Sequence, residues 1–124
     1  LAGHVSIENN AIIGGLSAIH QFVRIGKYSM VGGMSGVEQD IIPYGLYIGI
    51  RSYLRGLNLI GLKRKGLKSK EINALRKIFN KIFNKNDSVI NNIKNIKSNN
   101  NVEIEEIVNF ISQKSNRGIC TPKI

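Results

Sequence analysis

Residues 1–42 divide into seven consecutive units of six residues, with no insertion between them. Neither the 3.6-residue period of a helix nor the two-residue period of a half-buried strand produces a strict repeat of six. The first position of each unit is always aliphatic: Leu1, Ile7, Ile13, Ile19, Ile25, Val31 and Val37. The fifth position is small or β-branched throughout: Val5, Ala11, Ser17, Val23, Ser29, Ser35 and Ile41. A six-residue repeat is typical of a parallel β-helix.

We therefore predict a β-solenoid in which each hexad is one short strand and a turn. Three hexads close one triangular coil, and the first and fifth positions point inward. Helices of this hexapeptide type are known as left-handed, an exception to the usual crossover rule. Seven hexads make little more than two coils, so we expect further coils before Leu1.

The second position of the hexad contains glycine in three units, Gly14, Gly26 and Gly32. Glycine suits a turn where a side chain would crowd its neighbours or where φ is positive. His20, followed by Gln21, occupies the same place in another unit. A histidine facing outward from a turn adds nothing to the core. His20 is therefore a candidate site residue, and the alternative is a side chain that is merely solvated.

Pro43 ends the repeat, and the remaining chain has a different pattern. We expect residues 1–60 to form the coils and an irregular exit segment. Residues 61–124 are expected to form a glycine-flanked basic loop over 61–68 and a three-helix region. Apolar side chains at helical spacing predict these amphipathic helices, which would pack together and cap the β-helix. The predicted helices cover residues 72–83, 89–96 and 102–111.

The formal net charge of +10 is concentrated in the second part of the chain. Residues 1–50 have a net charge of −1, whereas residues 51–124 have +11. This surface is either a solvated lysine-rich tail or a contact for a nucleotide, an acidic carrier protein or a nucleic acid. The few aromatic residues are poorly interleaved with Lys and Arg, which disfavours a stacking surface for nucleic acid.

Other features exclude several classes of protein. The single cysteine, Cys120, cannot form an internal disulfide, which favours a reducing compartment. No apolar run approaches the roughly 18 residues of a membrane span. Two histidines and one distant cysteine do not make a metal site.

Three segments, "GGLSAIHQFVRIG", "MVGGMSGVEQDIIPYG" and "GLNLIGLKRKG", resemble the carboxy-terminal half of the UDP-N-acetylglucosamine O-acyltransferases of lipid A biosynthesis. The resemblance covers nearly the whole chain and is weakest after about residue 85. It implies a cytoplasmic homotrimer of left-handed parallel β-helices with helical carboxy-terminal caps and active sites between subunits.

The resemblance also implies a reaction. A 3-hydroxyacyl group passes from the phosphopantetheine thioester of acyl carrier protein to the 3-hydroxyl of UDP-N-acetylglucosamine, without a metal or other cofactor. The general-base histidine of the family belongs to an earlier coil, in a pattern that this chain lacks. We therefore expect the base upstream of Leu1, no catalytic residue among these 124 residues, and no activity from this chain alone.

The remaining matches are binding positions. They are His4 near the sugar, His20 and Gln21 near the nucleotide–sugar, Asn58, Arg64 and Lys65 at the uridine diphosphate, and Gly33 at the far end of the acyl chain. Two departures from the family stand out: Lys65 replaces a frequent Arg, and Ile60 replaces a Glu found in some members. A lysine offers phosphate a point charge in place of a bidentate fork.

Two other functions stay open on this pattern. One is a related hexapeptide acyltransferase, such as the later N-acyltransferase of the same pathway. The other is a non-catalytic basic β-helix that acts as a binding module. The motif "NLIGLKRKG" favours the O-acyltransferase, although the sequence leaves the preferred acyl length open.

Overall fold

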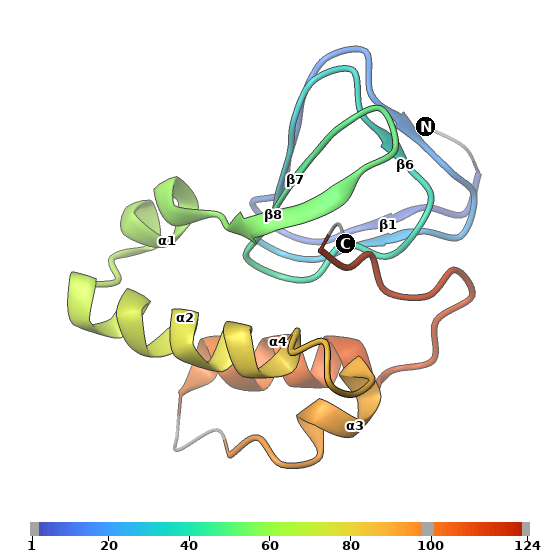
Figure 1. Ribbon diagram of the computed structural model, residues 1–124. Helices are drawn as coiled ribbons and strands as arrows, with labels where there is room; N and C mark the ends of the chain where they lie inside the picture. Colours follow the sequence, from blue (N-terminus) through green and yellow to red (C-terminus); the bar gives the residue numbers. More distant parts are fainter. Residues whose placement is uncertain (1–2, 98–100, 123–124) are drawn as a thin grey trace.

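The computed structural model describes residues 3–97 and 101–122, in which short strands are followed by helices (Figure 1). The hexads form two-residue strands: β1 (Ser6–Ile7), β2 (Ile12–Ile13), β3 (Ala18–Ile19), β4 (Arg24–Ile25), β5 (Met30–Val31) and β6 (Gly36–Val37). Two longer strands follow, β7 (Gly45–Ile48) and β8 (Tyr53–Leu57). The helices are α1 (Leu59–Lys65), α2 (Ser69–Ile82), α3 (Val89–Ile93) and α4 (Val102–Ser112).

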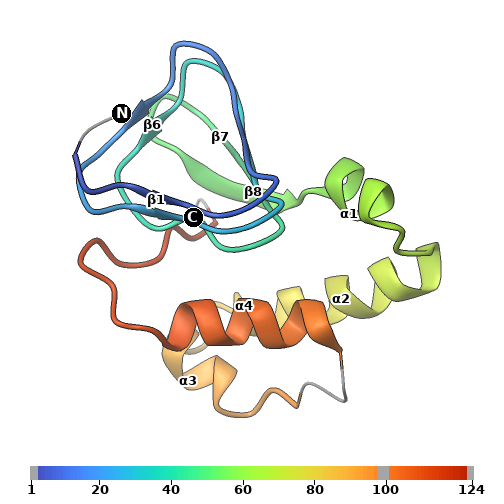
Figure 2. The same ribbon diagram turned by 180° about the vertical axis from the view of Figure 1, so that it is seen from behind.

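The hexads form a parallel coil in which strands eighteen residues apart are neighbours. β1 pairs with β4, β2 with β5 and β3 with β6, all in parallel, so that Ser6 lies opposite Arg24 and Ala18 opposite Gly36. This offset confirms the prediction that three hexads complete one turn. The coil outlines a triangle in both views (Figures 1 and 2).

The first and fifth hexad positions point into the coil, as predicted. The buried members are Ile19, Ile25, Val31 and Val37 at the first position and Val23, Ser29, Ser35 and Ile41 at the fifth. Burial is incomplete in the coil nearest the amino terminus. Ile7 is 42% exposed, whereas Ile25, its partner in the next coil, is completely buried. The apolar core is therefore deepest in the second coil and beneath it.

Left-handed backbone occurs at the fourth position of the hexad, not at the second. His4, Asn10, Leu16, Phe22, Tyr28 and Met34 have φ between 54° and 65°. Of the two reasons considered for the second-position glycines, crowding applies to Gly14 and Gly26, whereas a Cβ on Gly32 would lie 3.5 Å from its nearest neighbours. A Cβ on Gly14 would lie 2.4 Å from the backbone nitrogen of Gly33, and one on Gly26 would lie 2.4 Å from that of Pro43.

The chain's own hairpin and tail cover the last coil. β7 pairs in parallel with β5, and β8 returns antiparallel to β7. The tail runs beside them, where the backbone nitrogen of Cys120 donates to the carbonyl of Asp40 at 2.8 Å. The buried Tyr47 hydroxyl donates to the carbonyl of Cys120 at 3.1 Å.

The segment predicted as a basic loop over 61–68 is mostly helix α1, and that prediction was wrong. Asn58 is the N-cap, and its side-chain oxygen accepts a hydrogen bond from the backbone N–H of Gly61 at 3.2 Å. Gly66 ends the helix with φ of 106°, a left-handed conformation that glycine adopts without strain. Basic side chains in the last turn interact favourably with the helix dipole. Caps at both ends thus define a helix where glycines and charge suggested a loop.

Helices α2, α3 and α4 pack on one another and lie outside the triangle of the coil in both views (Figures 1 and 2). Their buried side chains are Ile72, Leu75, Ile82, Ile93, Ile104, Ile107, Phe110 and Ile111. These helices agree with the three predicted amphipathic segments, with boundaries that differ by a few residues. The end of the coil is covered by β7, β8 and the tail instead.

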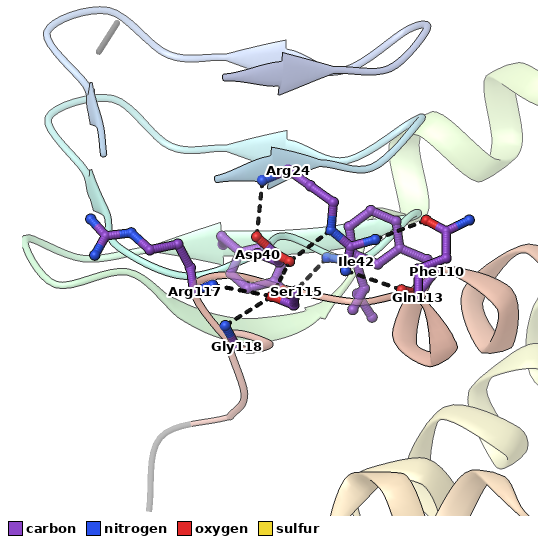
Figure 3. A network of polar contacts seen from close by, with 9 residues as sticks. Arg24, Asp40, Ile42, Phe110, Gln113, Ser115, Arg117 and Gly118 are labelled. Carbon is purple, nitrogen blue, oxygen red and sulfur yellow. Dashed lines mark hydrogen bonds and ion pairs between the residues drawn. The ribbon is translucent and has the colours of Figure 1, made fainter. Parts of the chain in front are cut away.

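A buried carboxylate fastens α4 and the tail to the coil (Figure 3). Asp40 is fully buried and accepts hydrogen bonds from the Arg24 guanidinium at 2.8 Å and from the Ser115 hydroxyl at 2.5 Å. Arg24 also donates to the side chain of Gln113 and lies over the ring of Phe110, 4.1 Å from its centroid. These contacts join segments that are far apart in the sequence.

Candidate functional site

The turns of the coil stack into three edges, which we call corners. The first corner contains residues 8–11, 26–29 and 43–44, the second contains 14–17 and 32–35, and the third contains 3–5, 20–23 and 38–40. The predicted site residues are distributed over all three corners. A single chain therefore does not bring them into one site.

The third corner presents His4, His20 and Gln21, all of which are exposed. The ring of His4 stacks on that of Phe22 with centroids 5.3 Å apart. This pair is positioned by the coil, because His4 and Phe22 both hold the fourth hexad position eighteen residues apart. The corner thus offers imidazole and amide groups to a ligand or a neighbouring molecule.

Gly33 lies at the second corner and is exposed. A Cβ there would lie 3.3 Å from the carbonyl oxygen of Gly15 in the coil before it, which is tight but not blocked. The adjacent side chains Leu16 and Met34 are 88% and 71% exposed. This corner is therefore an open apolar edge.

The first corner contains a pocket of about 450 Å³, and Arg64 lies on its wall. Helix α1 forms one side of the pocket and the coil forms the other. The lining residues are Asn10, Ala11, Ile12, Tyr28, Met30, Asn58, Ile60, Gly61 and Arg64. Pockets of this size hold small molecules in many proteins. The walls are mainly apolar, and Arg64 is the only cationic residue among the lining residues of the described chain.

Asn58 joins helix α1 to the coil beneath the pocket. It is only 4% exposed. Its side-chain nitrogen donates to the backbone carbonyl of Tyr28 at 2.8 Å, while its oxygen caps α1. The family resemblance places Asn58 at the uridine diphosphate, but the structure shows both the oxygen and the nitrogen of its amide in internal hydrogen bonds.

Lys65 points away from the pocket wall toward helix α4. Its ammonium lies 2.5 Å from a carboxylate oxygen of Glu103 and donates to the Tyr44 hydroxyl at 3.2 Å. It also lies 5.2 Å from the ring centroid of Tyr44 and 5.7 Å from that of Tyr28. Sequence reasoning did not identify Glu103, Tyr28 or Tyr44, because nothing in the hexad pattern places α4 at this corner.

A second ion pair contacts Tyr44 and extends the cluster formed by Lys65, Glu103 and Tyr44. Lys27 pairs with Glu106, and the Tyr44 hydroxyl donates to the other oxygen of Glu106 at 2.5 Å. Burial opposes ionisation of Glu106, but hydrogen bonds from Lys27 and Tyr44 outweigh it and lower its pKa. Burial and then the Glu106 hydrogen bond raise the pKa of Tyr44 well above its ordinary range. The hydrogen bond to Glu106 also raises the pKa of Lys27.

Residues 3–97 and 101–122 contain neither a metal site nor a membrane-spanning helix. No group of His, Cys, Asp and Glu side chains there has the arrangement of a metal site. Within the same residues, no helix has both the length and the apolar character that crossing a membrane requires.

A comparison with known protein families identifies the family of this chain. Residues 40–120 match the family described as "Udp N-acetylglucosamine O-acyltransferase; Domain 2". The chain belongs to this family. The matched segment includes Asn58 and helix α1, which contains Arg64 and Lys65.

Individual relatives of this O-acyltransferase family agree with the match. The chain is 40% identical over 125 residues to the acyl-acyl-carrier-protein–UDP-N-acetylglucosamine O-acyltransferase of Agrobacterium fabrum, covering 98% of this chain and 46% of that protein. A relative of the same name from Paracoccus denitrificans is also 40% identical, with the same coverage. The chain thus spans about half the length of the curated relatives that it matches.

Solved structures show the same correspondence. The UDP-N-acetylglucosamine acyltransferase of Campylobacter jejuni superposes with a TM-score of 0.87 at 33% identity, over 97% of this chain and 47% of that one. The Arabidopsis UDP-N-acetylglucosamine acyltransferase gives a TM-score of 0.86 at 35% identity, over 97% and 46%. The coil and its helices are therefore an arrangement that this O-acyltransferase family shares.

Proposed function

We propose that this chain is the nucleotide-sugar-binding portion of an O-acyltransferase of lipid A biosynthesis. The reaction transfers a 3-hydroxyacyl group from the phosphopantetheine of acyl carrier protein to the 3-hydroxyl of UDP-N-acetylglucosamine. The observation that carries the proposal is the first-corner pocket, in which Arg64 offers a cation beside apolar walls, in a chain of the matching family. A guanidinium is well suited to a diphosphate because its planar fork can donate two parallel hydrogen bonds.

The three faces of the coil support a trimeric assembly. Helix α4 packs against the face of β1 and β4 at Arg24 of β4, whose guanidinium lies over the ring of Phe110. The face of β2 and β5 presents Ile12 and Met30, and the face of β3 and β6 presents the small residues Ala18 and Gly36. A bulky apolar face against a flat face of small residues makes a heterologous contact, and such a contact forms a closed ring when the rotation between subunits is one third of a full turn. We propose a homotrimer of left-handed coils.

This assembly would unite the separate corners. Third-corner His4, His20 and Gln21 of one subunit would face the first-corner pocket of its neighbour, and Gly33 would border the acyl groove. We propose the helical region beyond α1 as a carboxy-terminal region that packs beside the coil, and the cytoplasm as the compartment. The buried, unpaired thiol of Cys120 fits a reducing environment.

Catalysis requires a general base, and we propose that neither histidine of this chain supplies it. His4 and His20 are assigned to binding. The chain alone should then bind the nucleotide sugar without transferring an acyl group. No resident metal or cofactor is proposed.

Calorimetric titration of the chain with UDP-N-acetylglucosamine tests the binding role. Replacing Arg64 by Met should weaken binding about 10- to 100-fold, since a charged hydrogen bond is lost. Lys81→Met is the matched control, because Lys81 is exposed on α2 and outside the pocket. Equal affinities of the wild type and Arg64→Met would show that the nucleotide sugar does not bind in this pocket.

A further inference from the structure

Three side chains of the α1 region, Asn58, Arg64 and Lys65, differ in what remains available to a ligand. Asn58 is buried, and its amide oxygen and nitrogen both have partners inside the chain. The Lys65 ammonium is held by Glu103 and Tyr44. Arg64 has no ion pair in the part of the chain that the structure describes, and it is exposed at the pocket wall.

The internal contacts of Asn58 fix where helix α1 begins. Its oxygen caps the helix, and its nitrogen is bonded to the carbonyl of Tyr28 in the coil. A Cβ on Gly61 would lie 2.5 Å from that nitrogen, so the first turn of α1 lies directly on the Asn58 amide. Turning the amide toward a ligand would leave the partly buried carbonyl of Tyr28 and the backbone N–H of Gly61 without these partners, which is costly.

The contacts of Lys65 fix where α1 ends. The side chain of Lys65 is 24% exposed and that of Glu103 is 13% exposed, so the pair is largely shielded from water. Glu106, one helical turn beyond Glu103, already pairs with Lys27 and Tyr44. If Lys65 moved to a ligand, Glu103 would become a shielded carboxylate without its cation.

We propose that Asn58 and Lys65 are positioning residues that clamp α1 between the coil and α4, and that Arg64 alone makes the cationic contact with the diphosphate. This inference rests on the proposed nucleotide-binding function. It differs from the expectation drawn from sequence, in which all three side chains touch the ligand. Lys65, the residue next to Arg64, acts indirectly. Its ion pair with Glu103 holds in place the helix that carries Arg64.

A double-mutant cycle on Lys65 and Glu103 distinguishes the two roles, with UDP as the probe. If the ion pair of Lys65 and Glu103 positions α1, Lys65→Met and Glu103→Gln should each weaken UDP binding roughly 3- to 10-fold. The double variant should then lose little more affinity than either single variant. If Lys65 were a phosphate ligand restrained by Glu103, Glu103→Gln would release it and strengthen binding. That strengthening would overturn the proposal.

Hydrogen exchange of the α1 amides gives a readout that needs no ligand. Lys65→Met and Glu103→Gln should both accelerate exchange over residues 59–65, to a similar extent and without additivity, whereas Arg64→Met should leave it unchanged. If neither Lys65→Met nor Glu103→Gln changes hydrogen exchange over residues 59–65, the proposal fails, whatever their effect on UDP affinity. If the wild-type chain has no affinity for UDP but the variants show the expected exchange pattern, the nucleotide site is refuted. The positioning roles of Lys65 and Glu103 would still hold in that case.

Asn58→Ala separates positioning from base recognition. As a positioning residue, Asn58 should affect UDP and ADP equally, so its loss lowers both affinities by the same factor and accelerates α1 exchange. A change in the ratio of UDP to ADP affinity with unaltered α1 exchange would show that Asn58 reads the base, and would contradict the assignment.

Discussion

Arg24 and Asp40 face each other across one turn of the coil, with the Arg24 side-chain nitrogen 2.8 Å and its backbone nitrogen 2.9 Å from the two carboxylate oxygens. Asp40 is completely buried, and Ser115 of the tail donates to it as well. The coil, α4 and the tail therefore depend on one carboxylate.

Replacing Asp40 by Ala should destabilise the chain by about 3 to 5 kcal/mol, because it leaves a partly buried guanidinium without its partner. Urea unfolding followed by circular dichroism measures the change. Glu38→Ala is the matched control two residues away: its pair with Arg51 is exposed and has a 3.7 Å separation, so the loss should stay below about 1 kcal/mol. Equal effects at the two positions would contradict the central role of Asp40.

A matched pair of isoleucines tests the burial gradient along the coil. Ile7 and Ile25 hold the same hexad position and are directly paired, but Ile7 is 42% exposed and Ile25 is fully buried. Ile25→Ala should cost about 2 to 5 kcal/mol, the usual range for a buried site, and Ile7→Ala much less. Similar unfolding free energies for both variants would show that the first coil packs as tightly as the second.

The cluster at the first corner predicts the pH range of stability. The pKa of Glu106 is lowered from 4.5, so its contribution is present above that value and is lost as the pH falls through the folded pKa. The pKa values of Tyr44 and Lys27 are raised from 10.0 and 10.5, so their contributions are lost as the pH rises beyond those values. Stability should therefore form a plateau between about pH 5 and 10.

Glu106→Gln is the variant that checks this origin. Urea midpoints measured from pH 3 to 11 should lose part of their acid dependence in the variant, because the titrating carboxylate is gone. An unchanged slope below pH 5 would place the acid sensitivity elsewhere in the chain.

The proposed trimer can be broken on one face. Met30→Glu places a charge on the apolar face of β2 and β5, and it should shift sedimentation from trimer to monomer. Ser6→Glu holds the same hexad position on the face of β1 and β4 and should leave assembly intact. A wild-type monomer at micromolar concentration, or a trimer that tolerates Met30→Glu, would contradict the proposed contact.

The coil was predictable because its repeat is local: the hexad phase gives the inward positions, and three hexads per coil add the offset of eighteen residues and the corner of each turn. The grouping of His4 with His20, and the separation of both from Gly33, follow from that phase. The helix α1 was missed because its identity depends on the caps Asn58 and Gly66 and not on apolar spacing.

The partners of Lys65 and Arg24 could not be predicted from any repeat. Glu103 lies 38 residues from Lys65, and Gln113 lies 89 residues from Arg24. Such contacts are decided by where α4 packs against the coil. A charged residue in a basic run can therefore be a structural clamp, although composition alone presents it as a ligand.

Acyl transfer by a chimera tests the central claim most directly. This chain would replace the matching portion of the Agrobacterium fabrum relative, of which it covers 46%. We expect the chimera to transfer a 3-hydroxyacyl group from acyl carrier protein to UDP-N-acetylglucosamine, and Arg64→Met to raise the KM for the sugar nucleotide about 10- to 100-fold. A folded chimera with the relative's oligomeric state and no transfer above the enzyme-free rate would contradict the account.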